Sequence, residues 1–254
     1  MSHHGTTGLG LLMLVSALAV PLVAYLLAVS ETNGAWPVRR SACWVGGLVA
    51  LAAGLGAGPV TGSPGFVAHT GSHLLIGMVA PLLLALGAPV PLALRALPVG
   101  RARALVRVLR SRPVRTLGHP ATAAVLNVGG LWLLYATPLY GPVHDHPLLH
   151  VHVLAAGYLF AAAILGAHPR PAAFGVRAAV LVAALAAHGV LAKYVYAHPP
   201  VGVPAADAEV GGVLMYYGGD VVDLVLIVLL CRAWFRTLGR GTAPARPVPA
   251  QSPS

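Results

Sequence analysis

Residues 70–90 read TGSHLLIGMVAPLLLALGAPV, and this stretch decides the class of fold. His73 is its one ionisable residue, and the other side chains are apolar or small. A helix needs about 20 consecutive apolar residues to cross the hydrocarbon core of a bilayer. The stretch is that long, and it lacks the alternation of polar and apolar residues that is typical of a strand. It therefore predicts a membrane-spanning helix.

Six further stretches have the same character, so the sequence predicts seven transmembrane helices. The predicted spans are 9–29, 41–58, 70–90, 119–137, 148–167, 178–198 and 212–235. The span 41–58 is short and rich in Gly and Ala, which allow close approach between helices. We expect an all-α fold, a polytopic membrane bundle that forms one domain over residues 1–238. A disordered cytoplasmic tail rich in Pro, Ala and Ser would follow over residues 239–254.

The composition agrees with a membrane protein. Of the 254 residues, 57% are hydrophobic and 9% are charged, and the mean hydropathy is +0.80. A soluble domain carries about 25% charged residues. The values exclude an ordinary water-soluble domain, a disordered chain and a nucleic-acid-binding arm. Cys43 and Cys231 are far apart and form no CxxC motif, so they indicate neither a disulfide framework nor a sulfur-ligated metal site.

The basic residues predict the orientation of the bundle. Of the 16 Lys and Arg residues, all but Lys193 fall in segments that share one side of the seven-span order. These segments are 30–40, 95–115, 168–177 and the C-terminal end. Because Lys and Arg favour cytoplasmic loops, we expect the N-terminus outside and the C-terminus inside the bacterial cytoplasmic membrane. The net charge of +10 then needs no nucleic-acid partner.

Local sequence features predict the structure of three segments near the ends of the bundle. Residues 1–8 contain no Lys or Arg, so we expect 9–29 to be a retained helix rather than a cleaved signal peptide. Residues 87–91, GAPVP, should end the third span at the inner face because proline interrupts a helix. The segment 101–112 mixes arginines with Leu and Val, which favours a basic amphipathic helix on the inner leaflet.

Histidines and carboxylates gather in the outer halves of the predicted helices. Ionisable groups inside a membrane are costly, and they persist where they pair or bind something. The candidates for metal ligation are His69, His73, His150, His152, His188, Asp220 and Asp223. His73, His150 or His152, His188 and Asp220 come from four predicted helices at compatible depths, whereas His69 could lie in the loop before its helix. Imidazole together with carboxylate suits copper, zinc or iron.

The spacing of these residues restricts which of them can share a site. His69 and His73 are four residues apart, and Asp220 and Asp223 are three apart, so each pair lies on one helix face. Two carboxylates on one buried face repel each other unless a cation or a proton intervenes. The spacing leaves a structural ion pair between Asp220 and Lys193 open as an alternative.

His150 and His152 follow Pro147, which is a favourable first residue of a helix. Two positions correspond to about 200° around a helix, so His150 and His152 cannot both face one site. The sequence does not decide which of the two does. His188 lies in the middle of the sixth span.

Four motifs resemble those of the CtaG-like family of cytochrome c oxidase assembly factors. They are HLLIGMVAPLLLALGAPV at 73–90, HPLLHVHVLAAGYLF at 146–160, AHGVLAK at 187–193 and MYYGGDVVDL at 215–224. They occur in order on the expected helices, and the resemblance extends over about residues 60–236. It implies a seven-helix membrane protein that acts with cytochrome c oxidase subunits and handles copper for the oxidase.

The resemblance marks His73, His150, His152, His188 and Asp220 as the polar motif positions, with His69 beside them. We therefore expect an outward-facing pocket that holds copper transiently, without enzymatic turnover. In this reading Asp220 is a ligand or orients an imidazole. The positive charge of Lys193 would modulate the access of the metal ion to the pocket.

Other functions are compatible with the same residues. Paired histidines on facing helices could be the axial ligands of a haem. His188, Lys193, Asp220 and Asp223 could form the relay of a proton- or ion-coupled transporter. The chain could also be a scaffold that holds oxidase subunits without binding a metal. The sequence contains no GxSxG motif and no phosphate-binding glycine loop, so it offers no support for a hydrolase or a nucleotide-binding enzyme.

Overall fold

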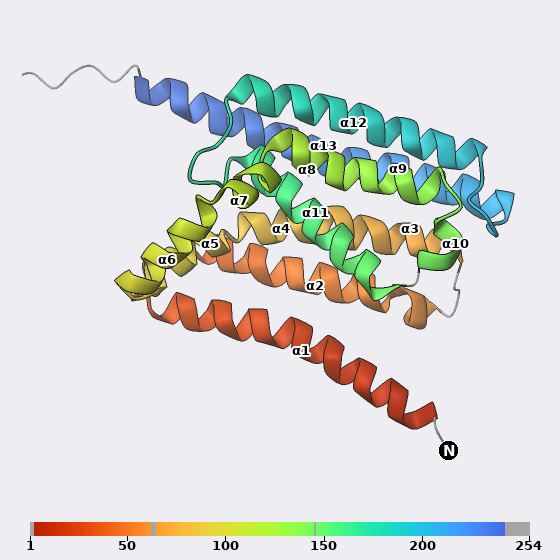
Figure 1. The fold of residues 1–254 in the computed structure, drawn as a ribbon, viewed down its shortest axis with the longest axis horizontal. Coiled ribbons are helices and arrows are strands. Elements are labelled where there is room, and N and C mark those ends of the chain that lie inside the picture. Colours follow the sequence, from red (N-terminus) through yellow and green to blue (C-terminus); the bar gives the residue numbers. More distant parts are fainter. Residues whose placement is uncertain (1–2, 62–64, 145, 242–254) are drawn as a thin grey trace, which may run out of the picture.

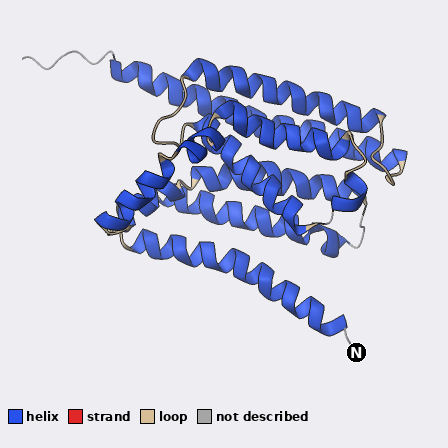
Figure 2. Cartoon of the chain, viewed as in Figure 1, coloured by secondary structure: helices blue, strands red, loops and turns tan. Residues whose placement is uncertain are grey.

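The computed structural model describes residues 3–61, 65–144 and 146–241, and every regular element in these ranges is a helix (Figure 2). No strand occurs in them, so the predicted all-α class is confirmed. Of the predicted tail, residues 242–254 lie outside the described residues, and the helix before them continues to Gly241.

The helices fall into three groups by length and continuity. The long helices are α1 (His3–Ser30), α2 (Val38–Thr61), α11 (Pro147–Leu165), α12 (Phe174–Ala197) and α13 (Ala205–Gly241). Two further rods each contain a π-helical turn: α3 (Phe66–Leu74), η1 (Leu75–Val79) and α4 (Ala80–Leu86), and α8 (Pro120–Ala124), η2 (Val125–Gly129) and α9 (Gly130–Tyr135). The short helices are α5 (Pro89–Ala96), α6 (Val99–Leu109), α7 (Arg112–Leu117) and α10 (Tyr140–Val143).

Within the described residues, five helical stretches are long and apolar enough to cross a membrane. They are Val38–Gly56, Phe66–Ala96, Pro147–Leu165, Phe174–Ala197 and Ala205–Thr237. The other two predicted spans, 9–29 and 119–137, correspond to shorter apolar stretches, which are Val15–Ser30 within α1 and Pro120–Tyr135. A multi-pass membrane bundle follows from these helices, whereas the count of seven stays a prediction.

The successive rods run back and forth between two ends of the bundle (Figure 1). One end carries α5, α6 and α7, the last turns of α13 and the connection between α11 and α12 (Figure 1). The opposite end carries α10 and the start of α11 (Figure 1). The arginine-rich segments thus gather at one end, which the charge rule assigns to the cytoplasm. The side of the membrane on which this end lies is still a prediction.

Helix α1 lies at the edge of the bundle and is anchored near its C-terminus (Figure 1). The Tyr25 hydroxyl donates a hydrogen bond of 2.8 Å to the Gly87 carbonyl, and Trp36 Nε1 donates one of 2.9 Å to the Tyr25 hydroxyl. Large apolar side chains such as Val20 and Leu27 remain 66% and 62% exposed. An apolar outer surface of this kind suits contact with lipid.

The π-helical turn η1 has a cause in the sequence. Pro81 has no N–H with which to bond the carbonyl of Gly77, four residues before it. The preceding backbone widens, and the Ala80 N–H bonds to the carbonyl of Leu75, five residues before it. Gly157 of α11 packs against this turn so closely that a Cβ at position 157 would overlap the Gly77 carbonyl oxygen. This packing brings α11 next to the rod that carries His73.

The rod ends where the sequence predicts it. Helix α4 stops at Leu86, and Ala88 has a left-handed backbone conformation with φ of 51° before α5 begins at Pro89. The predicted basic segment 101–112 is helical over α6 and the first residue of α7, and neither helix buries a side chain. These arginines are therefore available at the end of the bundle.

Candidate metal centre

A small cavity of about 30 Å³ lies between the central helices. His73, His188 and Asp223 line it, and these side chains are only 6%, 5% and 5% exposed. Met78 and Asn127 line the same cavity. A volume of about 10–15 Å³ is enough to hold one water molecule, so the cavity has room for a small ligand such as an ion.

His73 occupies the last turn of α3, immediately before the π-helical turn. Its ring lies against Gly77, where an added Cβ would stand 3.1 Å from Cε1. Its Nε2 is buried and has no hydrogen-bond partner. Buried polar atoms are almost always hydrogen-bonded, so this nitrogen requires an explanation.

His188 of α12 lines the same cavity, and like His73 it has a buried ring nitrogen without a hydrogen-bond partner. Its ring rests on Gly219 of α13, where an added Cβ would stand 2.5 Å from Cε1 and 2.8 Å from Nδ1. Its Nε2 is also buried and without a partner. Trp132 Nε1 donates a hydrogen bond of 3.1 Å to the Ala187 carbonyl, which ties α9 to α12 beside His188. The fold therefore brings two imidazoles with unpartnered nitrogens to one cavity.

The two carboxylates of α13 have different surroundings. Asp223 is buried and lines the cavity, whereas Asp220 is exposed. The Asp220 charge is close enough to His188 to interact with it electrostatically. Lys193, considered above as a partner for Asp220, places its ammonium 5.1 Å from the centre of the Tyr216 ring. Asp223 therefore shares the cavity with both histidines, whereas Asp220 interacts with His188 from an exposed position outside the cavity lining.

His150 and His152 point to different places, as their spacing on the helix requires. His150 lines a second cavity of about 20 Å³ together with His69 and His73. His152 is exposed, and its Nε2 lies 3.3 Å from the Leu126 carbonyl, on the side of η2. His150 is thus the member of the pair that shares the surroundings of the other histidines.

His69 lies one turn before His73 and faces an aromatic cluster. Its Nε2 shares a hydrogen bond of 3.1 Å with the Tyr135 hydroxyl. The ring centres of Tyr140 and His144 lie 5.2 Å and 6.0 Å from its own. Because His73 lines both cavities, the second cavity adjoins the first.

The seven candidates do not converge on a single point. Within the described ranges, no group of three or more His, Cys, Asp or Glu side chains is arranged to hold a metal ion. What the structure provides is a pair of buried imidazoles with a buried carboxylate at the same cavity, and a second histidine group next to it. Such an arrangement can offer few ligands at a time to a soft or borderline metal ion.

Sequence reasoning did not single out Asn127 or the turns around the cavity. Asn127 belongs to η2, so both π-helical turns border the cavity. The sequence does contain an indication of this residue, because a side-chain amide is unusual in an apolar stretch such as 119–137. Single π-helical turns inside α-helices often occur at functional sites.

A family model described as "Cytochrome c oxidase caa3 assembly factor" matches residues 23–237. The chain belongs to this family. The resemblance inferred from the four motifs is thereby confirmed. The family is described by its role in the assembly of a caa3-type cytochrome c oxidase.

Three mycobacterial proteins are similar in sequence to this member of the caa3 assembly-factor family. Uncharacterized proteins of Mycobacterium bovis and Mycobacterium tuberculosis are each 38% identical over 166 residues, which is 61% of this chain and 25% of theirs. An uncharacterized protein of Mycobacterium leprae is 30% identical over 250 residues, which is 86% of this chain and 38% of that protein. The chain thus spans a minor part of the length of these relatives. No solved structure matches it.

Proposed function

We propose that the chain holds copper transiently during assembly of a haem-copper cytochrome c oxidase and hands it to an oxidase subunit. The copper is cargo, and no turnover is involved. In this proposal His73 and His188 are the ligands, and the Asp223 carboxyl group lies at the same cavity. The chain acts in the bacterial cytoplasmic membrane, with its N-terminus outside and its C-terminus inside.

The observation that carries this proposal is the pair of unpartnered nitrogens. His73 Nε2 and His188 Nε2 are both buried, both lack a hydrogen bond, and both side chains line one cavity. A buried polar atom without a partner destabilises the fold by about 1–3 kcal/mol. Two of them at one cavity are explained if a ligand fills it part of the time. Neutral imidazole is a common copper ligand.

The second cavity supports a route of access. His69 and His150 line it, and both belong to segments that start at the end of the bundle opposite the arginines (Figure 1). His73 borders both cavities. A metal ion that enters the second cavity beside His69 could therefore pass by His73 into the cavity that His188 lines. A site with few ligands releases its ion more readily than a closed four-ligand site, which suits transfer to a partner protein.

The size of the cavity argues against haem. Cofactor sites occupy about 300–1,000 Å³. The cavity shared by His73 and His188 measures about 30 Å³, which leaves no room for a macrocycle between the two rings. Copper is therefore the better match for these two histidines.

A complementation experiment tests the proposal in cells. Cells that lack the protein receive the wild type, the His73→Ala/His188→Ala variant, or His152→Ala as a control that removes an exposed imidazole. The oxidase is then purified, and its copper content and activity are measured. We expect the wild type and His152→Ala to restore both, and the double variant to restore neither at equal membrane abundance. Full restoration by the double variant would support the scaffold function and refute copper transfer.

A further inference from the structure

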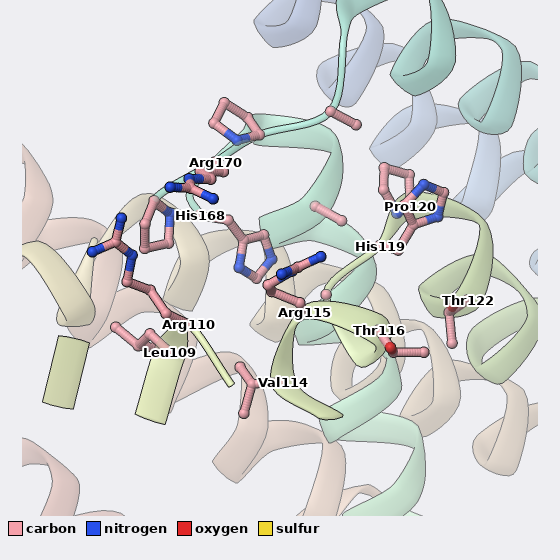
Figure 3. Close-up of a pocket in the computed structure, with 15 residues that line it drawn as sticks. Leu109, Arg110, Val114, Arg115, Thr116, His119, Pro120, Thr122, His168 and Arg170 are labelled. Carbon is pink, nitrogen blue, oxygen red and sulfur yellow. The ribbon is translucent and has the colours of Figure 1, made fainter. Parts of the chain in front are cut away.

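A larger cavity, separate from the metal centre, lies at the arginine-rich end of the bundle (Figure 3). Its volume is about 570 Å³, within the range of sites that hold small organic ligands. Its walls come from the end of α6, from α7, from the start of α8 and from the connection between α11 and α12. The metal centre uses none of the residues that line it.

The charged residues that line this cavity are all cationic. Arg110, Arg115 and Arg170 belong to three separate parts of its wall, and Figure 3 shows their side chains around the ring of His168. No Asp or Glu is among the lining residues. These three exposed arginines border one cavity without a carboxylate, and such a cationic lining attracts an anion. Arginine binds phosphate through paired N–H donors, which makes phosphate the best match.

Two histidines add hydrogen-bonding capacity to the same cavity. His168 Nε2 is buried and has no partner, and its ring rests on Gly118, where a Cβ would stand 2.7 Å from Cε1. His119 caps α8, since its Nδ1 accepts a hydrogen bond of 3.3 Å from the Ala121 N–H. A ring whose Nδ1 accepts carries its proton on Nε2, which leaves His119 with a free donor.

The remaining wall is apolar, and its position favours a lipid. Leu109, Val114 and Ala163 line the cavity beside the cationic groups. Helix α6, which reaches the cavity at its C-terminal end, buries no side chain and carries the arginines of an amphipathic segment. Basic pockets between helices at the cytoplasmic side of a membrane bind anionic lipid headgroups. Cationic and apolar walls together suit a phosphate with attached acyl chains better than a free anion.

We propose that this cavity binds the phosphate of an anionic phospholipid from the inner leaflet. Arg110, Arg115 and Arg170 hold the phosphate oxygens, the His168 ring contributes a hydrogen bond, and the acyl chains leave along the apolar wall. The lipid would connect α6 and α7 to the α11–α12 connection. This inference is independent of the proposed copper transfer.

A matched pair of triple variants tests the inference. Arg110→Gln/Arg115→Gln/Arg170→Gln removes the cationic wall of the cavity. Arg101→Gln/Arg103→Gln/Arg107→Gln removes the same charge from exposed positions of α6 that do not line the cavity. Each purified protein is placed in phosphatidylcholine nanodiscs with or without phosphatidylglycerol, and bound lipid is counted by native mass spectrometry. Inorganic phosphate is titrated in a parallel arm.

We expect the wild type and the α6 variant to retain phosphatidylglycerol, and the cavity variant to retain it roughly tenfold less or worse. All three proteins should elute as the same folded species with similar melting temperatures. Equal losses in the two triple variants would overturn the inference, because they would show general attraction to the α6 charges. Saturation by inorganic phosphate that displaces no lipid, or retention of the lipid by the cavity variant, would overturn it as well.

Discussion

Replacement of Gly219 by alanine tests whether the position of the His188 ring matters for copper. The added Cβ would stand 2.5 Å from His188 Cε1 and 2.8 Å from Nδ1. Real Cβ atoms do not approach other atoms so closely, so the ring has to move. The substitution displaces the proposed ligand His188 without removing it. Its effect on copper binding therefore reports the position of the ring, and not the number of ligands.

The expected size of the effect follows from two opposing contributions. Alanine is favoured over glycine in a helix by about 1 kcal/mol. Overpacking of a filled interior costs about 1–3 kcal/mol. The Gly219→Ala variant should therefore lose about 0–2 kcal/mol of stability. Gly71→Ala is the control, because a Cβ at Gly71 meets no atom within 4 Å and should gain stability.

Copper affinity is the decisive readout for this pair. Metal sites tolerate errors of about 0.2 Å in ligand distance, and changes that misplace a ligand weaken binding by about 10–100-fold. Competition with a chromophoric Cu(I) chelator should show such a loss for Gly219→Ala and none for Gly71→Ala. If Gly219→Ala lowers the melting temperature but binds copper as tightly as the wild type, His188 is not a ligand.

Three further predictions follow from the described contacts. Asp223→Asn should weaken copper binding at least several-fold in the chelator competition, whereas Asp220→Asn, which changes an exposed side chain, should have little effect; the reverse order would contradict the placement of the two carboxylates. Gly157→Ala should lower the melting temperature in detergent by several degrees, because its Cβ meets the backbone of Gly77, which cannot move aside; an unchanged melting temperature would contradict this packing. Burial lowers the pKa of His168 below its ordinary value of 6.5, so the unfolded chain binds this proton more readily than the folded chain. Lipid-depleted protein should therefore lose stability as the pH falls below about 6.5. In His168→Gln this part of the acid sensitivity should disappear, and a melting curve series with the same pH dependence as the wild type would refute the assignment.

The all-helical class and the membrane-spanning character of several helices could be predicted from the sequence, because they depend on the length and hydropathy of single stretches. The apolar stretch 70–90 is long enough to cross a bilayer, and the break predicted at 87–91 coincides with the end of α4 at Leu86. The π-helical turn η1 could not be predicted. Pro81 implies a missing hydrogen bond, but whether the backbone kinks or widens depends on packing against Gly157 of another helix.

The candidate site was predictable in part. His73 and His188 stand out as isolated imidazoles in apolar helices, and the structure brings them to one cavity. The spacing of His150 and His152 showed that one must face away, but not which one. That choice depends on how α11 is rotated about its axis, and an almost uniformly apolar helix carries little amphipathic pattern to indicate a rotation.

The contrast between Asp220 and Asp223 has the same origin. Both lie on one face of α13, about 60° apart around the helix, and the family motifs indicated the first of them as a polar position. A rotation of α13 by a fraction of a turn decides which carboxylate is buried. This rotation is fixed by Gly218 and Gly219, where Leu74 and His188 pack against the bare backbone. Such three-dimensional packing is not encoded in any single local pattern.

The central claim is that His73 and His188 bind the same copper ion, and metal analysis of the purified protein tests it most directly. Wild type, His73→Ala, His188→Ala and the control His152→Ala are loaded with Cu(I) in detergent, desalted and measured for bound copper per chain. The account predicts that wild type and His152→Ala retain one copper ion, and that each single loss of a cavity histidine removes most of it. Equal copper content in all four proteins would contradict the claim.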